Sequence, residues 1–132
     1  MTKNKGKFRF TYFTNKYEET YKFYKNKLEF NLGHSWDRNE NDKGALFAAG
    51  EGLIEILHRP SNEEDENSGL DYRIPQGVFM CIQVWNIDAL FEKYGLLKLP
   101  FKQELVDQTW GHRSFSIFDP NGIVIFFFQE QF

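Results

Sequence analysis

The sequence predicts an α+β fold built from two copies of a βαβββ module. Short stretches in which apolar and polar residues alternate indicate strands, and two segments with apolar residues at helical spacing indicate helices. The same order of elements starts again after about 70 residues, which indicates an internal duplication. Because 132 residues suit one domain, we expect residues 1–132 to form a single domain of two modules.

The first module is expected over residues 7–59. It opens with a strand in which Phe8, Phe10 and Tyr12 alternate with polar residues. Asn15 follows as a helix N-cap, with Glu18 at the spacing of a capping box. The helix that begins there has one apolar face, formed by Tyr17, Tyr21, Tyr24 and Leu28. Three strands complete the module, over residues 30–36, 44–49 and 53–57.

Residues 60–76 are expected to connect the two modules. The first part of this segment, residues 60–69, is polar and includes four consecutive acids, Glu63 to Glu66. Such a run can attract a cationic ligand, but a solvated loop that keeps the protein soluble is the favoured interpretation.

The second module is expected over residues 77–130. A strand over residues 78–84 leads to Asn86, which caps a second helix. The apolar face of this helix is formed by Ile87, Leu90, Phe91 and Tyr94. Strands follow over residues 101–106, 112–118 and 123–129, and Asp-Pro-Asn-Gly at 119–122 predicts a hairpin turn between the last two.

Composition and charge exclude several classes of protein. With 16 basic and 19 acidic residues and no dominant basic region, nucleic-acid binding is not indicated. The longest apolar run, residues 123–128, is far too short for a membrane helix. No secretory signal is recognised, and the lone Cys81 cannot form an internal disulfide, so a cytoplasmic location is expected. Aromatic residues make up 18% of the chain, enough to line a cavity or a subunit contact.

Two segments resemble the vicinal oxygen chelate superfamily, which includes glyoxalase I, bleomycin-resistance proteins and extradiol dioxygenases. Residues 20–30 read TYKFYKNKLEF, and residues 110–122 read WGHRSFSIFDPNG. The first is similar to a motif of the superfamily, and the second is similar to a segment common in its bleomycin-resistance branch, which usually has Gly where this chain has Glu29. The resemblance implies two sheets curled into half-barrels around a cup, with the helices outside and a second subunit often completing the site. A homodimer is therefore expected.

The alternation of the first strand of each module agrees with this picture. In the first module, Phe10 and Tyr12 are expected on the strand face that packs against the helix. In the second module, the same face carries Met80, Ile82 and Val84. The opposite faces are left to line the cup, and they carry Arg9, Thr11 and Phe13 in one module and Phe79, Cys81 and Gln83 in the other.

The resemblance also implies a divalent metal held by two residues from each module. Position by position, these ligands fall on Arg9, Glu55, Phe79 and Phe126. Glu55 alone can bind a metal there, and the permanent charge of Arg9 repels one. We therefore expect no metal and no other cofactor at the inherited position.

The three histidines do not suggest a replacement metal site. His34, His58 and His112 lie in separate strand regions without close ligand spacing, so scattered histidines are favoured over a new cluster. His112 follows Trp110 at the expected rim of the cup, where it is a candidate for ligand contact.

Glu55 lies in an apolar strand and needs a partner, which suggests an ion pair with Arg9. That pair could contact ligand or only fix two strands. For any one aromatic residue, packing in the core is an equal or better interpretation than a place in the wall of the cup. The candidate ligand-binding residues are Arg9, Phe13, Trp36, Glu55, Phe79, Trp110, His112 and Phe126.

The sequence favours a metal-free protein that binds a small aromatic or amphiphilic molecule in an aromatic-lined cup. Two alternatives stay open. One is a divergent glyoxalase-like lyase or isomerase, or a dioxygenase, with unmapped metal ligands or with Glu55 as general base. The other is an interaction or regulatory dimer whose own aromatic rings fill the cup.

Overall fold

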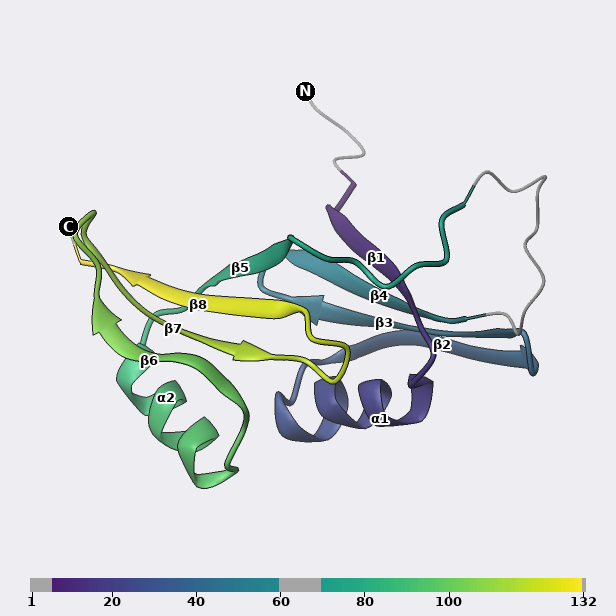
Figure 1. Ribbon diagram of the computed structural model, residues 1–132, viewed down its shortest axis with the longest axis horizontal. Helices are drawn as coiled ribbons and strands as arrows, with labels where there is room; N and C mark the ends of the chain where they lie inside the picture. The colour runs from purple at the N-terminus through teal and green to yellow at the C-terminus, as the bar shows by residue number, and fades with distance from the viewer. Residues whose placement is uncertain (1–5, 60–69, 132) are drawn as a thin grey trace.

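The computed structural model describes residues 6–59 and 70–131. The predicted α+β fold is confirmed, because these residues form two four-stranded sheets, each accompanied by a helix (Figure 1). The acidic run of the predicted connector lies outside the described residues.

The first sheet has the strand order β1-β4-β3-β2. Strand β1 is parallel to β4, and the other neighbours are antiparallel. The elements of this half are β1 (Arg9–Thr14), α1 (Tyr17–Lys22), a π-helical turn η1 (Phe23–Lys27), β2 (Leu32–Asn39), β3 (Asp42–Ala49) and β4 (Gly52–His58).

The second sheet repeats this topology with the order β5-β8-β7-β6. Strands β5 and β8 are parallel, as their counterparts are in the first sheet. The elements of this half are β5 (Phe79–Gln83), α2 (Ile87–Leu96), β6 (Phe101–Asp107), β7 (His112–Phe118) and β8 (Val124–Glu130).

The two helices begin differently. The predicted cap of α2 is confirmed, since the side chain of Asn86 accepts a hydrogen bond from the backbone N–H of Ala89 at 3.3 Å. The predicted capping box at Asn15 and Glu18 is wrong. The N-cap of α1 is Lys16, which makes no side-chain capping bond, and its backbone N–H donates to the Thr14 hydroxyl at 2.9 Å. Thr14 ends the strand with a hydroxyl in reach of that donor, so the helix starts one residue later than predicted.

The segment after α1 ends in a left-handed residue. The π-helical turn closes with a 3.0 Å hydrogen bond from Leu28 N–H to the Phe23 carbonyl, and Glu29 then adopts φ +58°. This conformation favours glycine, which gives a physical reason for the Gly expected there from the resemblance. Lys98, which follows α2, has φ +55°.

The core lies between the helices and the sheets. Tyr24 and Tyr94, which the duplication places at equivalent positions, are both almost fully buried, and their rings contact Phe47 and Phe115 respectively. The predicted assignment of strand faces is also confirmed for β1 and β5, where Tyr12 and Met80 belong to the core.

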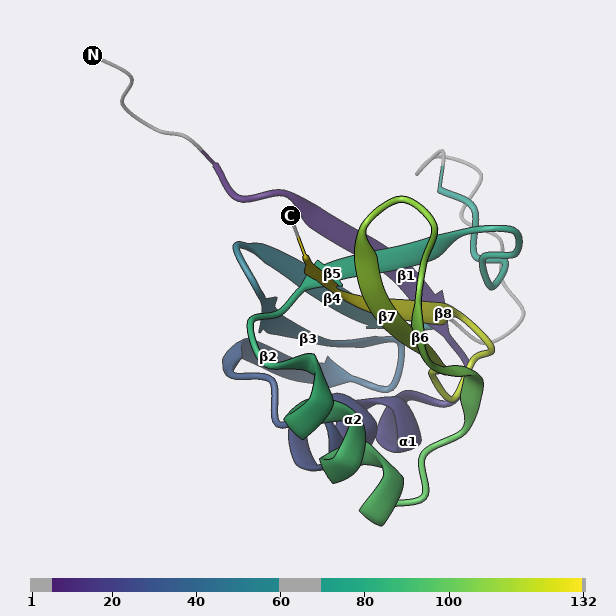
Figure 2. The ribbon, with the colours of Figure 1, turned by 90° about the vertical axis from the view of Figure 1, so that its left-hand side faces the viewer.

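The two sheets lie side by side along the longest axis of the molecule, and both helices lie on the same side of them (Figures 1 and 2). The hairpin between β7 and β8 reaches the first half of the chain, where the side-chain oxygen Oδ1 of Asn121 accepts a 2.6 Å hydrogen bond from the Thr14 hydroxyl. Within the described ranges, none of the helices is long and apolar enough to cross a membrane.

Candidate functional site

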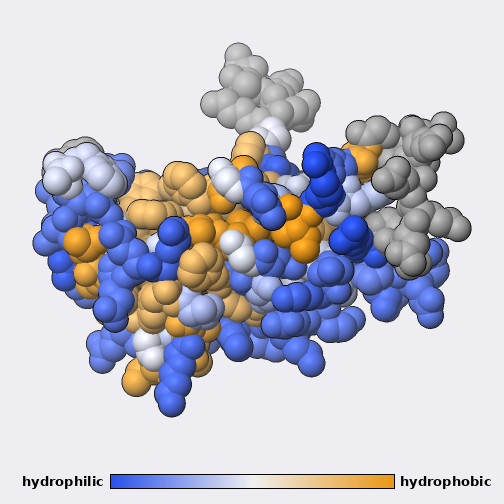
Figure 3. Space-filling model, viewed as in Figure 1, coloured by the Kyte–Doolittle hydropathy of each residue, from blue (hydrophilic) through white to orange (hydrophobic). Residues whose placement is uncertain are grey.

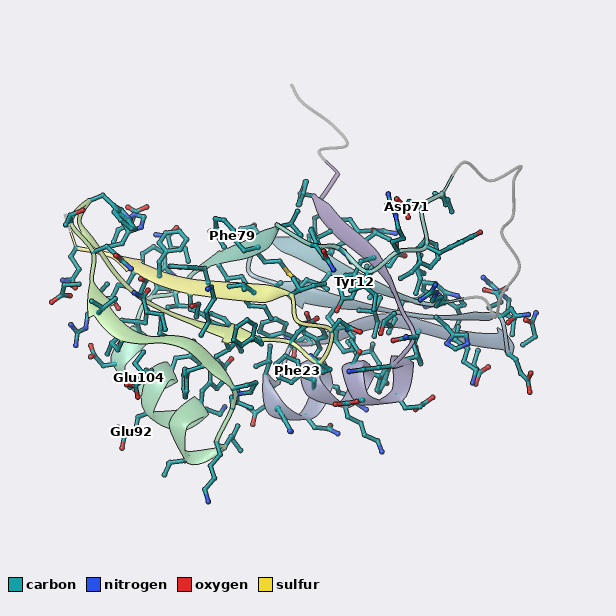
Figure 4. All side chains as sticks on the ribbon, in the orientation of Figure 1. Tyr12, Phe23, Asp71, Phe79, Glu92 and Glu104 are labelled. Atoms are coloured by element: carbon teal, nitrogen blue, oxygen red, sulfur yellow. The ribbon has the colours of Figure 1, made fainter. Side chains whose placement is uncertain are left out.

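Each sheet has a face turned away from its helix, which we call the open face. On β1 the open face carries Arg9 and Thr11, which are exposed, whereas Tyr12 on the other face is buried. On β5 it carries Phe79 and Cys81, both exposed, beside the buried Met80. Figure 3 shows hydrophobic residues gathered over β5 and β8, and Figure 4 shows Phe79 on the side away from the helices.

The predicted ion pair between Arg9 and Glu55 is present on the open face of the first sheet. Arg9 Nη1 lies 3.2 Å from Glu55 Oε2, and the Thr11 hydroxyl donates to Glu55 Oε1 at 3.0 Å. The strand register explains this contact, because Thr11 pairs directly with Glu55 in the parallel β1–β4 ladder. The carboxylate is mostly buried, at 14% exposed, and the guanidinium is 47% exposed. Both carboxylate oxygens therefore already have donors.

The equivalent place on the second sheet is occupied by two phenyl rings. Phe79 on β5 and Phe126 on β8 have ring centroids 5.8 Å apart. Neither ring can bind a metal or transfer a proton, so this pair offers apolar contact alone.

Aromatic residues continue along the open face of the second sheet. The His112 ring stacks on Phe128 at 4.6 Å with an interplanar angle of 15°, and the Trp110 ring lies 6.4 Å from His112. Trp110 is 59% exposed. The rings of Trp110 and His112 are thus neighbours.

Two further candidates lie on the first sheet. The Phe13 ring contacts Tyr72 edge to face at 4.5 Å. Trp36 covers Gly44 of the neighbouring strand, and its indole N–H donates to Asp42 at 3.1 Å. Since Tyr72 lies in the connector, outside both repeated patterns, no periodic signal could have identified it.

Two open cavities border Phe79. The first, about 640 Å³, lies between the β1–β4 edge of one sheet and β5 of the other. The second, about 610 Å³, lies between residues 74–78, the β7–β8 hairpin and the open face of the second sheet, where it is also lined by Phe126. We call it the hairpin cavity. Arg9, Glu55 and His112 line neither of them.

Comparison with protein families identifies the chain. A family model described as the Glyoxalase/Bleomycin resistance protein/Dioxygenase superfamily matches residues 8–127. The chain belongs to this superfamily. No protein with curated annotation matches the sequence.

Solved structures of the superfamily share the fold. A glyoxalase/bleomycin resistance protein/dioxygenase from Nocardioides is 18% identical with a TM-score of 0.72, over 98% of this chain and 86% of that one. Lactoylglutathione lyase from Agrobacterium tumefaciens is 14% identical with a TM-score of 0.71, over 97% and 96% of the chains. TioX from Micromonospora sp. ML1 is 14% identical with a TM-score of 0.72, over 94% and 95%. At these identities the likeness establishes the fold and not the activity.

The residues at the inherited metal positions of the superfamily do not fit a metal ion. The mapping is coherent in space, because the two residues assigned to each module are neighbours: Arg9 with Glu55, and Phe79 with Phe126. However, a carboxylate held by a guanidinium and a pair of phenyl rings offer no set of three or four converging donors. In the described part of the chain, no group of three His, Cys, Asp or Glu side chains is close enough to hold an ion.

The other reactive candidates are also separated. His58 lies on the helix side of the first sheet, 6.3 Å from the Tyr17 ring, and its buried Nδ1 has no hydrogen-bond partner among the described residues. His34 is next to Trp36, and His112 is on the second sheet. Although Cys81 is exposed, partial desolvation by neighbouring residues raises the pKa of its thiol, which lowers the thiolate fraction at neutral pH.

Sequence reasoning missed a polar strip on the open face of the second sheet. Ser114 and Ser116 on β7 are fully buried. The side-chain amide of Gln108 donates to the Ser114 hydroxyl at 2.9 Å and to the side-chain oxygen Oε1 of Gln103 at 3.2 Å. The alternation of Ser with Phe and Ile in β7 was the available signal, because it places both hydroxyls on the face opposite the core.

Proposed function

We propose that this protein binds a small aromatic or amphiphilic molecule without a metal, on its open faces, as a homodimer in the cytoplasm. The observation that carries the proposal is the replacement of the inherited ligand set by Arg9–Glu55 and Phe79–Phe126. Rings arranged along an exposed sheet face suit a planar ligand, by stacking and by burial of apolar area.

The homodimer is supported by what one chain leaves uncovered. Phe79 and Trp110 on the open face of the second sheet are 60% and 59% exposed. Exposed apolar groups of this size, gathered on one face, favour contact with another surface. A second copy that covered these residues would also turn an open face into an enclosed site.

The alternative, a lyase, isomerase or dioxygenase of the same superfamily, requires a metal or a free base. Glu55 is the sole carboxylate at the inherited positions, and both its oxygens already accept hydrogen bonds, one from a cation. This arrangement favours a role for Glu55 in joining β1 to β4 and in lining the site over a role as general base.

The experiment compares binding with catalysis on the same preparation. Binding of 2-naphthamide, a neutral planar probe, is measured by quenching of tryptophan fluorescence, with and without EDTA. We expect saturable binding that EDTA does not change, and that Phe79→Ala weakens. Leu96→Ala is the control, because Leu96 in α2 is exposed and lines neither cavity.

Measurements of metal content and of enzymatic turnover test the alternative, that the protein is a metal-dependent enzyme. The purified protein is analysed for nickel, zinc, iron and manganese, and is assayed for conversion of the hemithioacetal of methylglyoxal and glutathione. Stoichiometric metal together with turnover that EDTA removes would contradict the proposal and favour the enzyme. An absence of both, with probe binding, supports it.

A further inference from the structure

The hairpin cavity combines an apolar wall with one positive charge. Phe79, Val124 and Phe126 provide the wall, and Lys102 on β6 also lines the cavity. No Asp or Glu is among its lining residues, and within the described residues Lys102 forms no ion pair. The ammonium group is therefore not neutralised by any side chain of residues 6–59 or 70–131.

On the first sheet, the cation of the open face is neutralised by a carboxylate. The open-face cation there, Arg9, is paired with Glu55 at 3.2 Å. Along β5 and β8, the open-face residues Phe79, Cys81, Gln83, Val124, Phe126 and Phe128 are neutral. The charged residue on this face of β8 is Glu130, which pairs with His112 at the far end of the strand and does not line the hairpin cavity. Lys102 is thus the charge that selects among ligands.

We propose that the hairpin cavity binds an aromatic carboxylate. The ring of the ligand packs against Phe79 and Phe126, and its carboxylate pairs with the Lys102 ammonium. This inference rests on the proposed binding function and names the class of its ligand. An aromatic cation meets repulsion at Lys102, and a neutral amide gains the ring contact without the ionic contribution.

The test uses three probes with one ring system: 2-naphthoate, 2-naphthamide and 2-naphthylmethylammonium. Dissociation constants are measured by calorimetry for the full chain. We expect 2-naphthoate to bind about fivefold more tightly than the amide, which is the size of effect an exposed ionic contact gives, and the ammonium to bind most weakly.

Substitutions test which residues cause the preference for 2-naphthoate. Lys102→Met should remove the preference for 2-naphthoate and leave 2-naphthamide unchanged, whereas Lys27→Met, at an exposed lysine of the π-helical turn, should change neither. Melting temperatures of all variants are measured in parallel to exclude unfolding.

The outcomes separate this inference from the proposed function. Binding of the amide or the ammonium as tightly as the acid, or a preference that survives Lys102→Met, would overturn the inference while leaving a metal-free binding protein. Failure of all three probes to bind would overturn both.

Discussion

Tyr12 on β1 donates a 2.6 Å hydrogen bond to Asp119, the first residue of the hairpin between β7 and β8. Tyr24 donates to the same carboxylate oxygen at 3.0 Å, and the backbone N–H groups of Asn121 and Ile123 donate to the other oxygen. Asp119 is 4% exposed. A buried carboxylate with four donors thus joins the two halves of the chain on the core side of β1.

Removal of one of these donors should loosen the contact between the halves. Tyr12→Phe leaves Asp119 buried with three donors, so we expect a loss of about 2 kcal/mol in the free energy of unfolding. Urea denaturation measures this change. Tyr21→Phe is the control, because the Tyr21 hydroxyl donates to no described residue, and it should change stability by less than about 0.5 kcal/mol. Equal losses in the two variants would show that the bond to Asp119 contributes nothing specific.

The same residues predict a loss of stability at alkaline pH. Burial, followed by the charge of neighbouring groups, raises the pKa of Tyr12 and that of Tyr24 well above 10. Above about pH 10 the unfolded chain loses protons from these tyrosines and the folded chain keeps them. The stability contributed by the raised pKa values is therefore complete below pH 10 and declines as the pH rises further.

The slope of this decline can be measured by urea denaturation at increasing pH. Each such tyrosine should lower the free energy of unfolding by about 1.4 kcal/mol per pH unit above 10. Tyr12→Phe should reduce the slope by the contribution of one tyrosine, about 1.4 kcal/mol per pH unit. A wild-type stability that stays constant to pH 11 would contradict the burial of both hydroxyls.

Glu29 is predicted to be a strained position that glycine would relieve. Its φ of +58° costs about 1–2 kcal/mol for a residue with a Cβ. The ion pair of Glu29 with Lys93, at 2.8 Å between exposed groups, contributes less than about 0.5 kcal/mol. We therefore expect Glu29→Gly to raise the free energy of unfolding slightly, by about 0.5 kcal/mol, after the added chain entropy of glycine is included. Glu29→Ala, which keeps the strain and removes the pair, should lower it.

Two glycines should respond in opposite ways to alanine. A Cβ on Gly44 would lie 2.5 Å from Trp36 Cε2, so Gly44→Ala must displace the indole and should cost about 1–3 kcal/mol. Gly95 in α2 has no atom within 4 Å of an added Cβ, so Gly95→Ala should stabilise by up to about 1 kcal/mol. Thermal melts and the tryptophan emission wavelength distinguish the two. A Gly44→Ala variant with wild-type stability and emission would show that Trp36 does not cover Gly44.

Local sequence patterns were sufficient to predict most of the fold. The alternation of Phe10 and Tyr12 with polar residues placed β1, and Asp-Pro-Asn-Gly placed the last hairpin, where Gly122 adopts φ +82°. The start of α1 was misplaced because two hydrogen-bonding side chains, Thr14 and Asn15, compete for the same cap, and the geometry of the end of β1 decides between them.

Long-range contacts account for what the sequence could not predict. The hydroxyls of Tyr12 and Tyr24 carry no sign, in their own segments, that both donate to Asp119, about a hundred residues away. The Arg9–Glu55 pair could be predicted because a carboxylate in an apolar strand requires a partner and the family resemblance placed Arg9 inward in the same module. Lys102 was missed because the cavity that it lines is formed with residues 74–78 and the β7–β8 hairpin, which are distant from it in the sequence.

The central claim, that the inherited ligand positions do not hold a metal, is tested most directly by calorimetric titration with Ni²⁺ and Zn²⁺. The wild-type chain is compared with the triple variant Arg9→His, Phe79→His and Phe126→Glu, which supplies imidazole and carboxylate donors at the three inherited positions other than Glu55. We predict no stoichiometric binding to the wild type and one equivalent per chain in the variant. Tight binding of one equivalent to the wild type, lost in Glu55→Ala, would contradict the claim.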